Sequence, residues 1–217
     1  DRKLPENPYS MHLKIAEGCN NGCAYCIIPK IRGPFRSLPM EDVIKEAEKL
    51  AESGCKELVL IAQDLTYYGN DIYGDFVLPE LLKKLCRVDG IQWIRLMYCY
   101  QERITDELIY AIASENKICK YIDIPLQHSS DRVLINMRRK TTQSEIQSTI
   151  DKLRDRIPDI HIRTTLIVGF PGEDNDDFDN LYDFVEKNKF ERLGVFKYSC
   201  EEGTAAAKMP DHVDEEI

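Results

Sequence analysis

Long hydrophobic runs, a secretory leader and low-complexity tracts are all missing from this sequence. The longest clean apolar stretch covers residues 58–62, whereas a membrane-spanning helix needs ~20 such residues. No basic segment is followed by an apolar one, so no signal peptide is visible. These absences exclude a helical membrane protein, a fibrous repeat and a disordered chain, and we expect a globular protein of the cytoplasm.

Positive charge is scarce relative to negative charge. The 217 residues contain 29 Lys and Arg against 38 Asp and Glu, a formal net charge of −9. Acids and bases balance over residues 1–168, so the excess falls in residues 169–217. Nucleic-acid backbones bind stripes of Lys and Arg, so we expect no direct nucleic-acid binding by this chain. The acidic region suits a basic protein partner or, alternatively, only aids solubility.

A length of 217 residues suits one large domain or two small ones. The chain starts with Asp1 rather than Met, and residues 214–217 resemble the beginning of a helix. We therefore interpret residues 1–217 as a single domain taken from a longer protein. A chain of this size buries enough surface to fold without disulfides, and its eight cysteines fit a reducing compartment.

Strand patterns alternate with helical patterns along the chain. We expect strands at residues 11–16, 57–62, 91–97, 120–124, 160–168 and 192–197. We expect helices at residues 39–53, 78–88, 105–114 and 142–157, and one more marked by Phe178, Leu181, Tyr182 and Val185. Six strands that alternate with helices predict an α/β fold with one parallel sheet, either an open doubly wound sheet or a barrel.

Unusual residues gather directly after these strands. In both architectures the functional site lies at the carboxyl ends of the strands. The segments that follow the six strands are residues 19–26, 63–64, 98–100, 125–128, 169–173 and 199–203. The sequence therefore predicts a site on one rim of the sheet.

Three cysteines fall within eight residues in the first of these segments, at Cys19, Cys23 and Cys26. Thiolates are soft ligands that select zinc, copper(I) or iron–sulfur clusters, and structural zinc and 4Fe–4S sites normally take four ligands. The next cysteine, Cys55, is 29 residues away, so three thiolates would leave one metal position open, as in catalytic sites. Structural cysteines, or a zinc site with a distant ligand, are the alternatives. Gly18 and Gly22 fit a tightly wrapped loop.

The motif Cys19-x-x-x-Cys23-x-Tyr25-Cys26 resembles that of the radical S-adenosylmethionine (SAM) superfamily. The resemblance implies a 4Fe–4S cluster whose open iron binds SAM and cleaves it reductively to a 5′-deoxyadenosyl radical. It also implies a partial (βα)6 barrel of the TIM type, in agreement with the six strands expected above.

Further motifs resemble the methylthiotransferases, at residues 14–20, 32–37 and 167–173. Within that family, residues 62–64 and 125–128 are similar to the RimO type, which methylthiolates the β-carbon of an aspartate on the twelfth small-subunit ribosomal protein. One alternative is the type that modifies a tRNA adenosine. An alternative of another class is an iron–sulfur or zinc binding module without catalysis.

The resemblance implies roles for individual residues. Cys19, Cys23 and Cys26 would hold the cluster, and no catalytic side chain is expected beyond it. Gln63 stands where the superfamily often carries a Gly-Gly-Glu that holds the methionine amino group, so this sequence departs from the pattern there. The residues expected to bind the cofactor are Tyr25, Gln63, Gln127, Thr165 and Gly169.

Charged residues near the motif have two interpretations. Arg32 and Arg36 could favour the reduced cluster or hold a substrate carboxylate, or they could form a solvated pair. His128 lies on the expected rim and is a further candidate for substrate or cluster contact. We interpret residues 138–140, Arg-Arg-Lys, as a solvated turn.

The resemblance also implies components that this sequence lacks. Full-length methylthiotransferases carry an N-terminal domain with three more cysteines for a second 4Fe–4S cluster, and a small TRAM-like barrel at the C-terminus. Neither has a counterpart here. A flavodoxin or ferredoxin is the expected electron donor.

Overall fold

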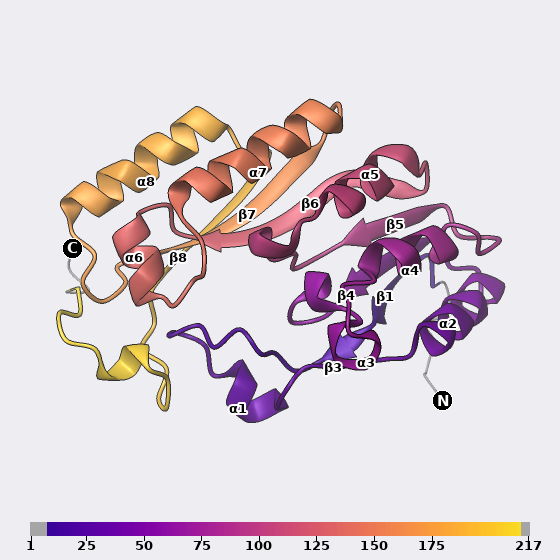
Figure 1. Cartoon of the computed structure of the whole chain (residues 1–217), viewed down its shortest axis with the longest axis horizontal. Coiled ribbons are helices and arrows are strands. Elements are labelled where there is room, and N and C mark those ends of the chain that lie inside the picture. The colour runs from indigo at the N-terminus through magenta and orange to yellow at the C-terminus, as the bar shows by residue number, and fades with distance from the viewer. Residues whose placement is uncertain (1–7, 214–217) are drawn as a thin grey trace.

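A computed structural model describes residues 8–213 and shows a curved sheet of six parallel strands (Figure 1). The strands follow one another across the sheet in chain order, without reversal. They are β1 (Ser10–Lys14), β4 (Glu57–Ile61), β5 (Trp93–Leu96), β6 (Ile118–Gln127), β7 (His161–Val168) and β8 (Arg192–Lys197). Residues 214–217, which we interpreted as the beginning of a helix, lie outside the described residues.

Helices connect the strands, and the longer ones lie along one side of the sheet (Figure 1). The longer ones are α2 (Met40–Glu52), α4 (Leu78–Leu85), α5 (Asp106–Ser114), α7 (Gln143–Arg156) and α8 (Asn175–Asn188). The short ones are α1 (Ile28–Arg32), α3 (Asn70–Tyr73) and α6 (Asp131–Asn136), with 3-10 turns η1 (Leu65–Tyr67), η2 (Gln101–Arg103) and η3 (Ala206–Lys208). A doubly wound sheet has helices on both faces and a reversal of strand order, so the partial (βα)6 barrel is confirmed.

Alternation along the strands separates the core from the inner face of the barrel. Leu60, Leu96 and Ile124 are fully buried in the main hydrophobic cluster with the helices. On the other face, Arg95 pairs with Glu57 at 2.7 Å between Nη2 and Oε1. The six-stranded sheet has β1 and β8 at its edges, so the barrel is open.

Several local signals are confirmed. Thr142 and Glu145 form the expected capping box at the start of α7, with each side chain bonded to the other residue's backbone N–H. Gly54 follows α2 with a φ of +98°, the left-handed conformation that glycine adopts most easily at a helix end.

Other boundaries differ from the expectation. The first strand ends at Lys14, and β2 (Ala16–Glu17) then pairs antiparallel with β3 (Arg36–Ser37) in a small second sheet. Strand β6 has ten residues rather than five. In α8, Phe178 and Tyr182 are exposed rather than part of the buried face.

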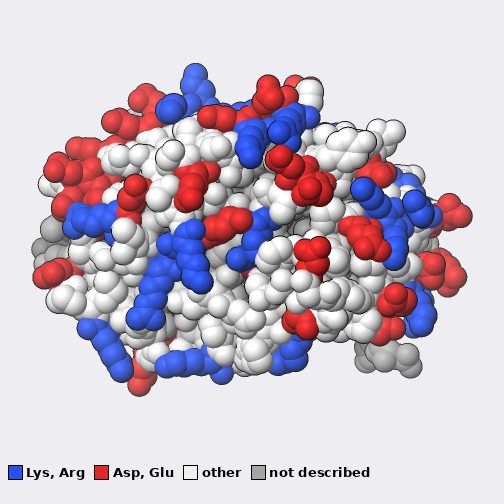
Figure 2. Space-filling view, viewed as in Figure 1, with Lys and Arg blue, Asp and Glu red and all other residues white. Residues whose placement is uncertain are grey.

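The acidic excess is concentrated on α8. Exposed acids occur along this helix at Asp176, Asp179, Asp183 and Glu186, and Figure 2 shows acidic side chains gathered over it. No helix between residues 8 and 213 has the length and apolar character that crossing a bilayer requires.

Candidate functional site

The cysteine-bearing loop, residues 18–26, connects β2 to α1 at the carboxyl end of the sheet. Gly18 has a φ of +80°, and a Cβ atom there would lie 2.1 Å from the Pro34 carbonyl oxygen. The loop therefore passes directly against the chain at residues 33–34, where the Cys19 N–H donates to the Gly33 carbonyl at 3.2 Å. Only glycine fits this approach.

Ala24 fixes the middle of the loop to two other parts of the chain. Its N–H donates to the carbonyl of Met137 at 2.9 Å, just after α6, and its carbonyl accepts from the Ala206 N–H at 2.8 Å. Between these anchors Gly22 has a φ of +68° with open space around it. Cys19 and Cys23 are buried, whereas Cys26 is partly exposed.

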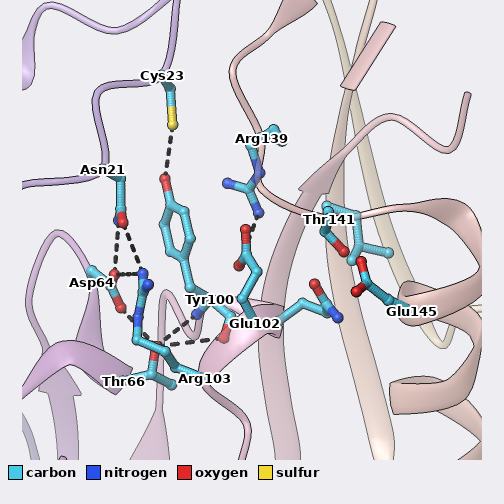
Figure 3. A network of polar contacts seen from close by, with 12 residues as sticks. Asn21, Cys23, Asp64, Thr66, Tyr100, Glu102, Arg103, Arg139, Thr141 and Glu145 are labelled. Atoms are coloured by element: carbon cyan, nitrogen blue, oxygen red, sulfur yellow. Dashed lines mark hydrogen bonds and ion pairs between the residues drawn. The ribbon is translucent and has the colours of Figure 1, made fainter. Parts of the chain in front are cut away.

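Asn21 joins the loop to the ends of two strands (Figure 3). Its Nδ2 donates to Oδ2 of the buried Asp64 at 2.7 Å, just beyond β4. Arg103, in η2 beyond β5, pairs with Asp64 and donates to Asn21 Oδ1 at 2.8 Å. Thr66 donates to the other Asp64 oxygen at 2.7 Å. We call Asn21, Asp64 and Arg103 the loop latch.

Tyr100 contacts a cysteine and lies between two guanidinium groups. Its hydroxyl lies 3.2 Å from Cys23 Sγ. The Arg139 guanidinium carbon is 4.2 Å from the ring centroid and that of Arg103 is 5.2 Å away. The Arg139 side chain is 1% exposed, so the interpretation of residues 138–140 as a solvated turn is wrong for this residue. Its neighbours Arg138 and Lys140 are exposed.

Burial sets the electrostatics of the cysteines. Loss of solvent raises the pKa of the Cys19 thiol and of the Cys26 thiol. A metal ligand must be a thiolate, so metal binding here releases protons. Among residues 8–213, no three His, Cys, Asp or Glu side chains converge closely enough to hold one metal ion.

Tyr25 packs within the second hydrophobic cluster, whose buried members are Ala24, Val133, Met137, Phe170 and Ala206. Its ring lies edge-on to Phe170, with centroids 6.4 Å apart. Phe170 follows Gly169 at the end of β7. Tyr25 therefore couples the loop to the turn beyond the fifth strand of the six-stranded sheet.

Two expected cofactor residues have amide oxygens without a partner. Gln63 and Gln127 follow β4 and end β6, and in each the Oε1 atom is buried with no hydrogen bond from any described residue. Gln127 also has a φ of +75°, a strained conformation of the kind found at functional sites. Thr165 is half-buried on β7, and Gly169 has a φ of +73° with no atom closer than Val213 to an added Cβ. These residues stay predictions for cofactor contact.

His128 lies beneath the rim rather than on it. The side chain is fully buried, its Nδ1 accepts from the Ser130 N–H at 2.9 Å, and its Nε2 lies 3.5 Å from Glu173 Oε1. Glu173 in turn accepts from the Phe170 N–H at 2.9 Å. His128 therefore supports the turn after β7, and a role toward substrate or cluster stays a prediction for this residue.

Arg32 and Arg36 are exposed and close together. Arg32 pairs with Glu17 at 3.7 Å, and Arg36 donates to the Arg32 carbonyl at 3.4 Å. This arrangement is compatible with a solvated pair, and a contact with the cluster or a substrate carboxylate stays a prediction for both residues.

Sequence reasoning missed the side chains that hold the loop. Asp64 and Tyr100 lie in segments that the strand pattern had placed on the rim, so their position could be predicted. The contacts of Asp64 could not be predicted, because Asn21 and Arg103 are 82 residues apart in the chain and come together only in the folded structure.

Comparison with known protein families gives one match that covers most of the chain. A family model described as the radical SAM superfamily matches residues 13–185. That range includes the cysteine loop, the loop latch and every strand from β4 to β7.

Curated relatives are similar over nearly the whole chain. A ribosomal protein uS12 methylthiotransferase RimO from Lachnoclostridium phytofermentans is 58% identical over 209 residues, which are 96% of this chain and 48% of the relative. One from Clostridioides difficile is 57% identical over 216 residues, 100% of this chain and 49% of the relative. The chain thus spans about half the length of the curated relatives it matches.

Solved structures share the fold at low sequence identity. The radical S-adenosylmethionine methyltransferase TsrM from Kitasatospora setae has a TM-score of 0.71 at 16% identity, over 87% of this chain and 36% of that chain. SuiB from Streptococcus suis has a TM-score of 0.64 at 15% identity, over 95% of this chain and 44% of that chain. The open barrel, the cysteine loop at its rim and the family match together show that this chain belongs to the radical SAM superfamily.

Proposed function

We propose that this chain is the radical SAM domain of a methylthiotransferase of the RimO type, which modifies the β-carbon of an aspartate on ribosomal protein uS12. The observation that carries the proposal is the loop of three thiols, anchored at the rim of an open (βα)6 barrel. The high identity to RimO proteins supports the type of substrate.

The donor set of the loop fits a 4Fe–4S cluster. Cys19, Cys23 and Cys26 would hold it as thiolates, the ligands that such clusters take. When bound, a cluster with one iron free of protein ligands supplies the electron for reductive cleavage of SAM. Backbone hydrogen bonds to Gly33, Met137 and Ala206 fix the loop at Cys19 and Ala24.

The surrounding rim fits a polar ligand such as SAM. The amide oxygens of Gln63 and Gln127 are buried acceptors without donors among residues 8–213, and such atoms normally have a partner. SAM carries an ammonium group and ribose hydroxyls that would donate to them. Tyr25, Thr165 and Gly169 would line the same cofactor.

Other parts of the proposal concern the longer protein. We place the second cluster and the TRAM-like barrel in the remaining half of the RimO length, and we expect a flavodoxin or ferredoxin as electron donor in the cytoplasm. A basic ribosomal protein is complementary to the acidic surface of α8 (Figure 2).

The experiment follows a hydrogen atom from substrate to cofactor. The reconstituted, reduced chain is incubated with SAM and a uS12 peptide that carries deuterium on the aspartate β-carbon. Deuterium in the 5′-deoxyadenosine product, detected by mass spectrometry, is the expected result. If the 5′-deoxyadenosine gains no deuterium from this peptide but forms faster in the presence of tRNA, the result favours the tRNA type. If the chain binds iron without cleaving SAM, it is a non-catalytic module.

A further inference from the structure

Arg139 is a buried charge that the packing of the protein does not explain. Its side chain is 1% exposed, and none of its three side-chain nitrogens donates a hydrogen bond to a described residue. The one carboxylate beside it, that of Glu102, lies 3.9 Å away. A buried charge without good partners destabilises a fold, so its presence here calls for a functional reason.

The guanidinium lies against a residue that contacts a cysteine of the loop. It stacks 4.2 Å from the centroid of the Tyr100 ring, and the Tyr100 hydroxyl lies 3.2 Å from Cys23 Sγ. Figure 3 shows the ring standing between Cys23 and the backbone near Thr66, with Arg139 beside it. A cysteine thiolate can only accept, so the hydroxyl donates when Cys23 is a ligand.

The Arg139 guanidinium and the Tyr100 hydroxyl would both affect the charge of a cluster held by Cys23. Hydrogen bonds to the sulfurs, the net charge nearby and solvent exposure set the potential of an iron–sulfur centre. Reduction adds one negative charge, which a fixed positive charge in a medium of low dielectric stabilises strongly. The donor hydroxyl at Cys23 withdraws charge from the same sulfur.

We propose that Tyr100 and Arg139 are positioning residues that raise the reduction potential of the cluster held by Cys23. In the step concerned, one electron passes from an external reductant to the cluster, no bond forms or breaks, and Tyr100 keeps its proton. The inference rests on the proposed function, because it requires a cluster on this loop.

The test measures the midpoint potential of the reconstituted cluster by redox titration followed by electron paramagnetic resonance. Iron per chain is measured first in wild type, Tyr100→Phe, Arg139→Met and Arg139→Lys. The control is Tyr67→Phe. Tyr67, like Tyr100, stacks on the Arg103 guanidinium, but its ring packs against Phe35 and Phe76 rather than a cysteine. A wild-type chain that binds no iron would overturn the proposed function itself.

We expect full iron in all variants and a lower potential in Tyr100→Phe and in Arg139→Met. The expected shift is at least a tenfold change in the equilibrium constant, ~59 mV for one electron. Arg139→Lys keeps the charge and should retain most of the wild-type potential, and Tyr67→Phe should match wild type. Unchanged potentials in Tyr100→Phe and Arg139→Met would overturn the inference, as would loss of iron binding in Tyr100→Phe.

The metal-free chain supplies an independent readout. If Arg139 serves the cluster, Arg139→Met should unfold at the same temperature as wild type or higher, because it removes a poorly paired buried charge. A clear fall in the unfolding temperature of the metal-free variant would assign Arg139 a structural role and contradict the inference.

Discussion

At the scale of single residues, the shape of the cysteine loop depends on two glycines in different ways. Both have positive φ angles, yet only Gly18 lies against other atoms, with the Pro34 carbonyl in the space of a Cβ. Gly22 faces open space. The pair therefore separates the effect of close contact from the effect of backbone conformation.

We predict that Gly18→Ala destabilises the chain by about 2 kcal/mol or more, because the added methyl group meets backbone as well as strain. Gly22→Ala carries only the conformational penalty of about 1 kcal/mol. Urea unfolding of the two metal-free variants measures the difference. Equal losses in both would show that the contact at Pro34 does not constrain the loop.

Single residues also show where sequence reasoning stops. The three cysteines stand out because thiols at this spacing have a specific chemistry. Arg139 could not be distinguished from Arg138 and Lys140, because the groups beside it, the Tyr100 ring and the Glu102 carboxylate, lie in a different segment of the chain. His128 was expected on the rim but lies buried beneath it, against Glu173 and the turn after β7.

At the scale of elements, the loop latch holds the cysteine loop to the ends of β4 and β5. Asp64 is 1% exposed and Arg103 17%, so the two form an almost buried ion pair. Removing one partner of such a pair leaves the other charge buried and uncompensated. The resulting loss in the free energy of unfolding is larger than the net stabilisation that the intact pair provides.

We predict that Asp64→Asn lowers the free energy of unfolding by about 3 kcal/mol. The control is Asp106→Asn, since Asp106 pairs with Arg156 at 3.0 Å on the surface and should change stability by less than ~1 kcal/mol. Chemical denaturation of the metal-free variants makes the comparison. Similar small effects at both sites would contradict the role given to the latch.

The start of α8 should make stability depend on pH. Burial raises the pKa of Asp177, but hydrogen bonds from the Ser130 hydroxyl, the Asp174 N–H and Arg132 outweigh it and hold that pKa below its ordinary 3.8. A lowered pKa in the folded state means that the carboxylate stabilises the fold above the unfolded value. That stabilisation is lost as the pH falls through the folded pKa.

We therefore expect Asp177→Asn to reduce the loss of stability on acidification below the ordinary pKa of 3.8. Unfolding free energies measured at a series of acidic pH values, in wild type and in the variant, give the two slopes. Parallel curves would show that Asp177 titrates alike in the folded and unfolded chain.

Most elements could be predicted from the sequence because apolar periodicity marks a helix face or a buried strand. Strand β6 was underestimated mainly at its end, because Pro125 and Gln127 do not fit the usual pattern of a buried strand and were assigned to the segment that follows it. In α8 the apolar stripe was read too widely, since Leu181, Phe184 and Val185 pack against the core whereas Phe178 and Tyr182 are exposed. Apolar periodicity is therefore a weaker signal at the ends of a strand and at the margins of a helix face than in the buried core.

At the scale of the whole molecule, the described part of the chain is an open barrel that presents one cysteine-rich loop. The other five cysteines are spread along the chain, from Cys55, which is buried, to Cys200, which is exposed. Cleavage of SAM needs only the cluster and the cofactor, whereas methylthiolation also needs a source of sulfur beside the substrate.

We predict that this chain, reduced and reconstituted, forms 5′-deoxyadenosine slowly and leaves uS12 without a methylthio group. Mass spectrometry of uS12 after incubation, with the nucleoside product measured in parallel, tests both halves. A methylthio adduct made by this chain alone would show that its own residues supply a sulfur site.

The central claim is that Cys19, Cys23 and Cys26 hold a cluster with an iron open to SAM. The most direct measurement is the electron paramagnetic resonance spectrum of the reduced, reconstituted chain before and after addition of SAM. The account predicts a cluster signal that changes on addition of SAM, that is lost in Cys19→Ala, Cys23→Ala and Cys26→Ala, and that remains in Cys55→Ala. A signal that does not change on addition of SAM, or one that remains in any of the three loop cysteine variants, would contradict this claim.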